Sequence, residues 1–288
     1  GARPERHPEP GACVARLSSR GSPIHQRRTA ENHLMHHDWQ VLIRGARVFD
    51  GTGGPSTMED IAIADGKIAA RGHGLPLDRA DRVVDATGRW LLPGLLDIHT
   101  HLDLEVELAP GLPESVRHGT TTVVVGNCSL GTAFGAQRRN GDDPILDCFT
   151  RVENMPKPVL RKVVDRIDWH TTGGYFSHLD QVPLGPNIVP LLPHSMLRIE
   201  AMGSTDAAVT REPTATERKR MRTLLEEAMA QGYAGLSTDS IPFHYLANDP
   251  HRSERIPAQH ASWSELKELL DVVRSHDRVW QCTPDAAN

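Results

Sequence analysis

A meander of short strands is predicted between residues 39 and 90, where short apolar runs alternate with polar or small residues. The alternation at residues 61–63 leads into Asp65-Gly66, a dipeptide typical of two-residue β-hairpin turns, and residues 67–69 form the returning strand. Such a meander has too few strands to enclose a core, so we expect it to pack against another part of the protein.

Two further features fall within this meander. Gly45 separates apolar positions on either side and is expected to form a turn. Val83-Val84 form another short strand, which ends before the turn residues Thr87-Gly88.

After residue 94 the pattern changes to a succession of strand, loop and helix. Residues 120–125 form a continuous β-branched run between Gly119 and Gly126, which is typical of a strand buried in a parallel sheet. Residues 188–192 and 234–237 are further candidate strands.

Two helices carry their own start and stop signals. Thr214 and Glu217 form a capping box, apolar residues follow at helical spacing, and Gly232 ends the helix. Ser262 and Glu265 repeat the box before a second helix. Each helix leads into a short apolar run, and such repeated units imply a parallel sheet with helices outside it.

These features predict an α/β fold, an incomplete (β/α)8 barrel with part of a small β-sandwich on its N-terminal side. About five barrel strands can be counted, the last one ending near Pro284, so we expect that this chain cannot close a barrel. The expected organisation is a disordered tail at residues 1–37, part of the sandwich at 38–92 and the first half of the barrel at 93–288.

The tail is set apart by its composition. Residues 1–34 are rich in Arg, Pro, Ser and Gly, show no hydrophobic periodicity and lack the apolar segment of a secretory signal. Met35 stands just before the first strand and offers an alternative start of translation.

Composition and charge exclude several classes of protein. Hydrophobic residues make up 38% of the 288 residues and charged residues 24%, which is typical of a soluble globular protein. A net charge of -5 gives no electrostatic case for nucleic-acid binding, and no apolar run approaches the roughly 20 residues needed to cross a bilayer. The four cysteines have no C-x-x-C spacing, so we expect reduced thiols in a cytoplasmic protein; they are Cys13, Cys128, Cys148 and Cys282.

His99 and His101 form the strongest candidate metal-binding pair. Residues two apart on a strand point to the same face, so both imidazoles can reach one ion. Asp97 shares that face, and Asp103 would share it if the strand continued. Imidazole and carboxylate suit zinc and similar divalent ions. An H-x-H pair also occurs as solvent-facing loop histidines, but this pair follows an apolar strand, at the end where barrels build their active sites.

The chain from residue 46 to residue 103 resembles the opening pattern of the amidohydrolase superfamily. The matching elements are Gly51 after Phe49-Asp50, the hairpin at Asp65-Gly66-Lys67-Ile68, Asp85-Ala86-Thr87-Gly88, and Pro93-Gly94-Leu95-Leu96-Asp97 with the two histidines. The resemblance implies a metal-centred (β/α)8 barrel with a small β-sandwich, which would account for the meander. It also implies metal ligation by His99 and His101.

Cys128 is the second candidate ligand, in the Gly-Asn-Cys turn after the strand at residues 120–125. A lone cysteine is usually a small buried hydrophobe, but a thiolate at this end of the strand would be stabilised by a divalent cation. The turn resembles the N-acyl-D-amino-acid deacylases (D-aminoacylases), in which a cysteine replaces the bridging carboxylated lysine of other branches. The resemblance implies Cys128 as a metal ligand, with one or two zinc ions.

The resemblance to this subfamily extends over roughly residues 38–284 and includes residues 193–198 and 235–238. It suggests a substrate-binding role for His194, although an ordinary core or loop histidine fits the sequence equally well. His178, His244, His251 and His260 have no supporting spacing and are expected at the surface.

The sequence also departs from the subfamily pattern. A metal-binding histidine is expected on the strand after the Ser262 helix, but residues 278–283 contain none. Cys282 could substitute only if it faces inward, and Gln281 and Thr283 share the opposite face. The general-base aspartate is expected on a last barrel strand that this chain does not contain, so no catalytic residue is assigned.

The implied reaction is metal-dependent hydrolysis of an N-acyl-D-amino acid, a small-molecule substrate, to a carboxylate and a free amino acid. One alternative is a truncated or divergent, non-catalytic relative. Another is a cyclic amidase resembling hydantoinase or dihydropyrimidinase, which the presence of Cys128 in place of a bridging lysine disfavours. The sequence does not indicate the oligomeric state.

Overall fold

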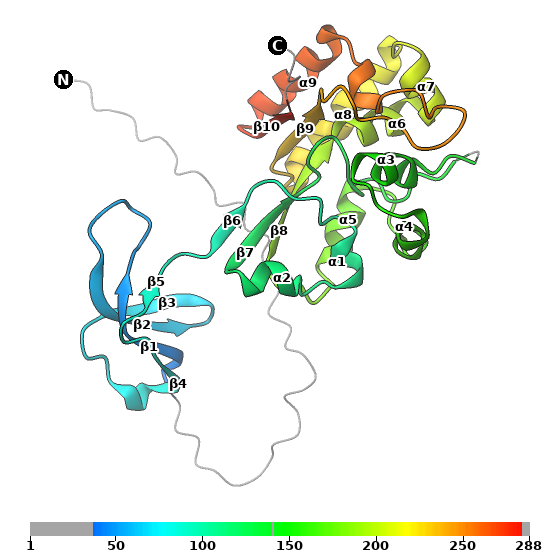
Figure 1. Ribbon diagram of the computed structural model, residues 1–288. Helices are drawn as coiled ribbons and strands as arrows, with labels where there is room; N and C mark the ends of the chain where they lie inside the picture. Colours follow the sequence, from blue (N-terminus) through cyan, green and yellow to red (C-terminus); the bar gives the residue numbers. More distant parts are fainter. Residues whose placement is uncertain (1–36, 140, 284–288) are drawn as a thin grey trace, which may run out of the picture. The chain divides into compact units, whose positions relative to one another are not determined.

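The structure, a computed structural model, describes residues 37–139 and 141–283. The described residues divide into two compact units, one ending at Gly94 and the other beginning at Leu95 (Figure 1). The expected disordered tail, apart from His37, lies outside the described residues, as does Cys13.

The N-terminal unit is a five-stranded sheet with the order β3-β2-β1-β4, in which β5 also pairs with β1. Its elements are β1 (Trp39–Val48), β2 (Thr57–Ala64), β3 (Lys67–Gly72), the 3-10 helix η2 (Leu77–Arg79), β4 (Ala80–Asp85) and β5 (Trp90–Leu91). Strand β1 pairs antiparallel with β2 and parallel with β4 and β5. It is therefore the centre of the unit.

The hairpin between β2 and β3 confirms the turn predicted at Asp65-Gly66. Both residues have positive φ, 53° and 71°, as a type I′ hairpin turn requires. The turn expected at Gly45 is wrong, because β1 continues through this residue as a bulge. Gly45 has a φ of 67°, and its N–H donates to Asp60 Oδ1 at 2.7 Å, which satisfies the donor that leaves the ladder.

The apolar residues of this unit form two small clusters rather than one core. One cluster holds Trp39, Leu42, Ala62 and Ala80, and the other holds Ala46, Val48, Ile61 and Ala86. Large apolar side chains of the same sheet, such as Ile68 and Trp90, are exposed. This agrees with the expectation that the meander alone does not enclose a core.

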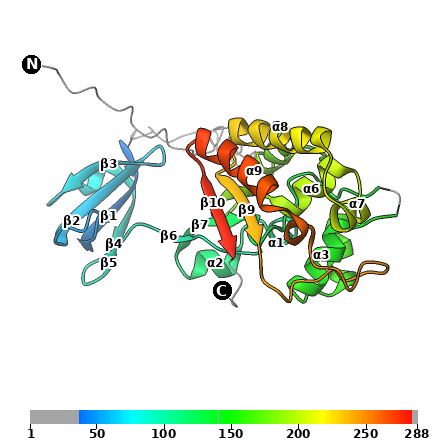
Figure 2. The same cartoon turned by 90° about the horizontal axis from the view of Figure 1, so that it is seen from above.

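The C-terminal unit is built on a curved five-stranded sheet with the order β10-β9-β8-β7-β6 (Figure 2). Its strands are β6 (Leu95–Asp97), β7 (Thr120–Val125), β8 (Asn187–Pro193), β9 (Gly235–Asp239) and β10 (Val279–Thr283). All neighbouring pairs are parallel and follow chain order. The described strands thus form part of a (β/α)8 barrel, which confirms the predicted fold class, and their carboxyl ends lie at one edge.

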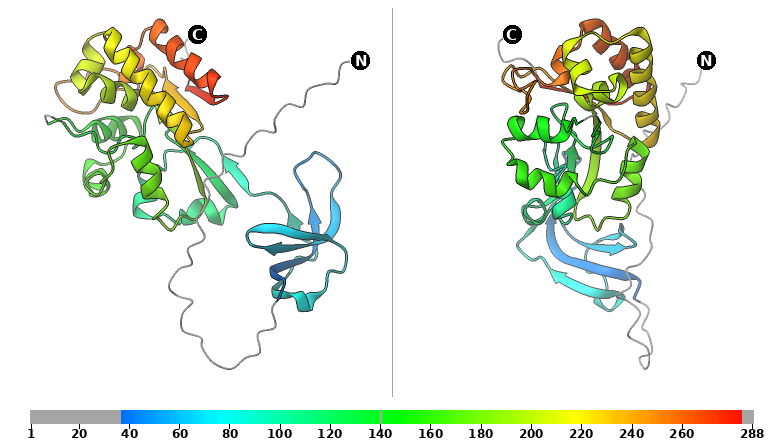
Figure 3. Two further views of the ribbon diagram at one scale, coloured as in Figure 1. Left: turned by 180° about the vertical axis from the view of Figure 1, so that it is seen from behind. Right: turned by 90° about the vertical axis from the view of Figure 1, so that its right-hand side faces the viewer.

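Helices connect these strands. They are α1 (Glu105–Leu108), α2 (Pro113–Arg117), α3 (Pro144–Val152), α4 (Lys157–Val164), α5 (Thr172–Leu179), α6 (His194–Met202), α7 (Thr205–Thr210), α8 (Ala215–Gln231), the 3-10 helix η3 (Pro257–His260) and α9 (Trp263–Ser275). Helices α8 and α9 lie side by side and cover β9 and β10 (Figure 3). None of the described helices is long and apolar enough to span a bilayer.

The predicted start of α8 is confirmed and that of α9 only in part. Thr214 and Glu217 form a full capping box, and Gly232 ends α8 with a φ of 116°. Ser262 Oγ accepts from the Glu265 N–H at 3.4 Å, but the Glu265 carboxylate does not return the bond. That carboxylate instead contacts His194 and Arg198, two buried side chains of α6.

The interior between this sheet and its helices forms one large apolar cluster. Strand residues Val123, Val125, Leu192 and Leu236 meet helix residues such as Met221, Leu225, Leu269 and Val273, all of them buried. Burying each large side chain contributes about 1.5–3 kcal/mol, so this cluster is the main source of the unit's stability.

Gly235 sets the spacing of β9 and β10, which generates a stability prediction. The Cβ of an alanine there would lie 1.8 Å from the carbonyl oxygen of Val279, so the two strands could not keep their pairing. We expect Gly235→Ala to lower the free energy of unfolding by at least about 1–3 kcal/mol in urea titrations. In the control Gly111→Ala the new Cβ meets no atom within 4 Å. Equal urea midpoints for the two variants would contradict the prediction.

Candidate functional site

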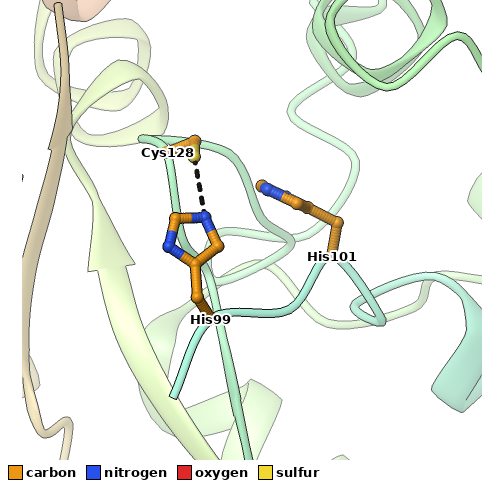
Figure 4. Close-up of side chains that lie close together, drawn as sticks. All are labelled: His99, His101 and Cys128. Atoms are coloured by element: carbon orange, nitrogen blue, oxygen red, sulfur yellow. Dashed lines mark hydrogen bonds between the residues drawn. The ribbon is translucent and has the colours of Figure 1, made fainter. Parts of the chain in front are cut away.

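Three predicted metal ligands converge at the carboxyl edge of the parallel sheet. His99 and His101 follow β6, and Cys128 follows β7. One ligand atom from each residue lies within 4.8 Å of the other two, and His99 Nε2 is 3.1 Å from Cys128 Sγ (Figure 4). Among the described residues this is the one group of three or more His, Cys, Asp or Glu side chains that are close enough to hold one ion.

The carboxylates expected beside the histidines are not part of this group. Strand β6 ends at Asp97, so the alternation of faces does not extend to Asp103. Asp97 is exposed, whereas Asp103 is almost fully buried, and burial raises the pKa of its carboxyl to about 7. Neither carboxylate joins the three ligands within the described structure.

A pair of side chains fastens the histidine loop to the turn that carries the cysteine. Thr100 Oγ1 donates to the carbonyl oxygen of Val124 at 2.7 Å. Asn127 Nδ2 donates to the carbonyl oxygens of Thr100, at 3.2 Å, and of Val124, at 2.9 Å. Because Asn127 is fully buried, these bonds face no competition from water.

The turn itself has an uncommon backbone. Cys128 and Ser129 have φ values of 50° and 65°, in the left-handed region that costs a non-glycine residue about 1–2 kcal/mol. At Gly126 a Cβ would lie 2.3 Å from the carbonyl oxygen of Leu191, so only glycine fits. Such strain persists where surrounding contacts hold it, and it often marks a functional position.

Hydrogen bonds from β9 and β10 hold this turn. Ser237 Oγ, on β9, donates to the Gly126 carbonyl and accepts from the Ser129 N–H at 3.1 Å. The N–H of Cys128 donates to Gln281 Oε1 of β10, also at 3.1 Å. The position of the thiol therefore depends on three strands of the sheet.

Burial sets the charge state of two of the three candidate ligands, His101 and Cys128. Burial, assisted by His99 and His244, lowers the pKa of His101 to about 4, so its imidazole is neutral at pH 7 and its contact with Glu153 at 3.4 Å is not an ion pair. Burial also raises the pKa of the Cys128 thiol to about 12, and nearby carboxylates add to this effect. The thiol is thus protonated until a cation stabilises the thiolate.

This donor set fits a zinc-type ion. Neutral imidazole and thiolate are the usual ligands of zinc. His101 Nδ1 is shielded from solvent and has no hydrogen-bond partner within residues 37–139 and 141–283, so it is available to a ligand.

The strand that lacks the expected histidine presents Gln281 to the cluster. Since Gln281 reaches the N–H of Cys128, its neighbour Cys282 points to the opposite face of β10 and is exposed. Cys282 does not face the three candidate ligands, so it does not replace the expected histidine.

His194 lies apart from the three ligands. It is the first residue of α6, it is buried, and its Nε2 is 2.8 Å from Glu265 Oε1, while Arg198 also pairs with Glu265. It borders a pocket of about 390 Å³ that Asp239 and Arg255 also line. A substrate-binding role for His194 stays a prediction.

Two groups near the cluster were missed by the sequence reasoning. His244, expected at the surface, is only 8% exposed, and its Nδ1 is 2.8 Å from Asp239 Oδ2, so that expectation is wrong. Glu153, which follows α3, contacts His101. Asp239 is the last residue of the barrel strand β9, at the end where barrels build their active sites. A carboxylate at that position was the sequence signal that could have drawn attention to this region.

The comparison with known proteins identifies the family. Residues 82–264 match the Amidohydrolase family, and this chain belongs to it. An uncharacterized protein of Mycobacterium tuberculosis is 41% identical over 255 residues, covering 87% of this chain and 41% of that protein. The N-acyl-D-aspartate deacylase of Alcaligenes xylosoxydans xylosoxydans is 35% identical over 205 residues, covering 69% of this chain and 36% of the deacylase. The chain thus spans less than half the length of these relatives.

A solved structure agrees with the sequence relatives. N-acyl-D-glutamate deacylase from Bordetella bronchiseptica, complexed with zinc and a phosphonate inhibitor that mimics the tetrahedral intermediate, superposes with a TM-score of 0.66 at 28% identity. The match covers 85% of this chain and 45% of that enzyme. The fold of the metal-dependent deacylases is therefore shared.

The buried contact of Glu265 with Arg198 generates a second stability prediction. Glu265→Ala would leave the Arg198 charge buried without a partner, and we expect it to cost about 3–5 kcal/mol of unfolding free energy. Glu268→Ala is the matched control, because Glu268 is partly exposed and its ion pairs contribute about 0–1 kcal/mol. A loss at Glu265 no larger than that at Glu268 would contradict the prediction.

The ion pair between Glu265 and Arg198 also predicts that the stability of the protein depends on pH. Burial opposes ionisation of Glu265, but hydrogen bonds and charge from His194 and Arg198 outweigh it and lower the pKa of Glu265. Its contribution is therefore complete above about 4.3, the unfolded value, and is lost as the pH falls below it. We expect the stability difference between wild type and Glu265→Ala, measured by urea titration, to shrink below about pH 4. A difference that grows on acidification would show that the pKa is shifted the other way.

Proposed function

We propose that this chain contributes the zinc-binding half of a hydrolase that acts on linear amide C–N bonds, with N-acyl-D-amino acids as substrates. The observation that carries the proposal is the convergence of His99, His101 and Cys128 at the carboxyl edge of the sheet. The similarity to N-acyl-D-aspartate and N-acyl-D-glutamate deacylases supports the substrate class.

The three side chains would hold the ion. Lewis-acid activation of the amide carbonyl and of water is the chemistry that zinc supplies in such a site. The residues of this chain contribute two imidazoles, of which that of His101 is neutral, and a buried Cys128 thiol that would ionise on binding the cation. The number of ions, one or two, and the aspartate expected on a further strand remain predictions.

Cys128 also favours linear over cyclic amides. Cyclic amidases of the superfamily are expected to use a bridging lysine, whereas the turn after β7 offers a thiol. A cytoplasmic location fits the free thiols of Cys128, Cys148 and Cys282.

A non-catalytic member of the family is the second candidate. Gln281 stands on the strand where the subfamily is expected to carry a metal-binding histidine, and its side chain is engaged by the backbone of Cys128. A site with fewer ligands would bind metal weakly or not at all.

Metal content distinguishes the two candidates. We expect about one zinc per chain in the purified wild type by elemental analysis, and its loss in Cys128→Ala and His101→Ala. Cys282→Ala should keep the metal, because that thiol is exposed on the opposite face of β10. Folded wild type without metal would reject the zinc site and leave the non-catalytic candidate.

A further inference from the structure

We propose that Gln281, on β10, is a positioning residue of the metal site, and that its side-chain amide holds the turn after β7 so that the Cys128 sulfur can bind the ion. The inference rests on the proposed function, because it concerns the same metal ligands. It gives β10 a part in the site although the described strand carries no histidine.

The first observation is the hydrogen bond that joins β10 to the turn. The N–H of Cys128 donates to Gln281 Oε1 at 3.1 Å, between residues 153 positions apart in the chain. A backbone N–H can only donate, so the oxygen of the amide must face the turn and its NH2 group must point elsewhere. In this orientation Gln281 acts on the site through the backbone of Cys128.

The second observation is the register of the sheet below the turn. Gln281 is the register partner of Ser237 on β9, and Ser237 is the partner of Pro193 on β8. Ser237 Oγ donates to the Gly126 carbonyl, and Pro193 Cγ would lie 2.8 Å from a Cβ placed at Gly131. The segment that contains the turn therefore rests on one level of the sheet, to which β10 contributes Gln281.

The turn needs these contacts because of its backbone. Cys128 and Ser129 have φ values of 50° and 65°, in the left-handed region that is unfavourable for a residue other than glycine. The N–H of Ser129 is held by Ser237 Oγ at 3.1 Å, and the N–H of Cys128 is held by Gln281. Loss of the Gln281 acceptor would therefore release the peptide group that directly precedes the Cys128 side chain.

The position of the sulfur follows from the position of this peptide group. A cysteine side chain has a single torsion between heavy atoms, so a fixed backbone leaves its sulfur only the staggered positions. In the structure Cys128 Sγ is 3.1 Å from His99 Nε2 (Figure 4). A rotated peptide would carry the sulfur away from the histidines.

The two histidines have a separate support. Thr100, which lies between His99 and His101, donates from Oγ1 to the carbonyl oxygen of Val124 on β7 at 2.7 Å. That contact does not involve β10. Removal of the Gln281 acceptor should therefore detach the thiolate from the ion selectively and leave the two imidazoles in place.

The test measures binding of Zn²⁺ and Co²⁺ to the full chain. Gln281→Leu keeps the approximate size of the side chain and removes the acceptor. We expect it to raise the Kd for zinc by about 10- to 100-fold, measured by competition with a chromophoric chelator. At saturating Co²⁺ it should also lose the near-ultraviolet charge-transfer band of a thiolate–cobalt bond, while the visible bands of bound cobalt remain.

Two variants calibrate these measurements. Cys128→Ala gives the cobalt spectrum without the thiolate. Thr283→Val is the matched control on the same face of β10, because Thr283 Oγ1 donates to the carbonyl oxygen of Thr238 at 3.4 Å and not to the turn. It should keep the wild-type Kd for zinc and the full charge-transfer band.

A measurement on the wild type does not depend on how the variants fold. A scalar coupling across the hydrogen bond is expected between the Cys128 amide ¹⁵N and the Gln281 side-chain ¹³Cδ in NMR spectra. A resolved Cys128 amide signal without this coupling would overturn the proposal, even if Gln281→Leu does not fold.

The metal-binding outcomes separate this proposal from the proposed function. If the wild type binds zinc and Gln281→Leu keeps the same Kd and the same charge-transfer band, the positioning role is overturned and the zinc site stands. A weaker Kd with an unchanged band would indicate a general loss of structure and would also overturn the role. A folded wild type that binds no metal overturns the proposed function and this inference together.

Discussion

The site depends on the parallel pairing of β6 with β7, in which Asp97 lies opposite Val123. Parallel strands end at the same edge, so the histidine loop and the cysteine turn emerge side by side. Asn127 then joins the two connections by hydrogen bonds to both backbones. The left-handed backbone at Cys128 is tolerated because buried bonds from Ser237 and its neighbours hold the turn.

The electrostatic setting follows from that packing. Burial keeps His101 neutral and keeps the Cys128 thiol protonated in the absence of a cation. The carboxylates Asp103, Glu153 and Asp239 raise the pKa of the thiol further, so the surroundings of the site favour a positive charge.

Local signals in the sequence predicted the features that depend on short-range physics. The Asp65-Gly66 hairpin and the full capping box at Thr214 each need residues only a few positions apart, and both are confirmed. His99 and His101 also lie close together, but β6 ends at Asp97, so the loop after the strand places them and the predicted alternation of strand faces does not. Cys128 lies 29 residues from His99, and only its position after a strand and the family resemblance suggested that they meet.

Tertiary packing decided what local pattern could not. The Glu265 carboxylate leaves its capping box because Arg198, buried beside it, needs a counter-charge. His244 is buried against Asp239 by a loop fastened to α3, and no spacing in the chain reveals these contacts. By itself the sequence determined the β2–β3 hairpin and the start of α8, because these depend on near neighbours. The orientation of the site residues depends on which buried charges and strand faces meet in the folded chain, and that only the tertiary structure decides.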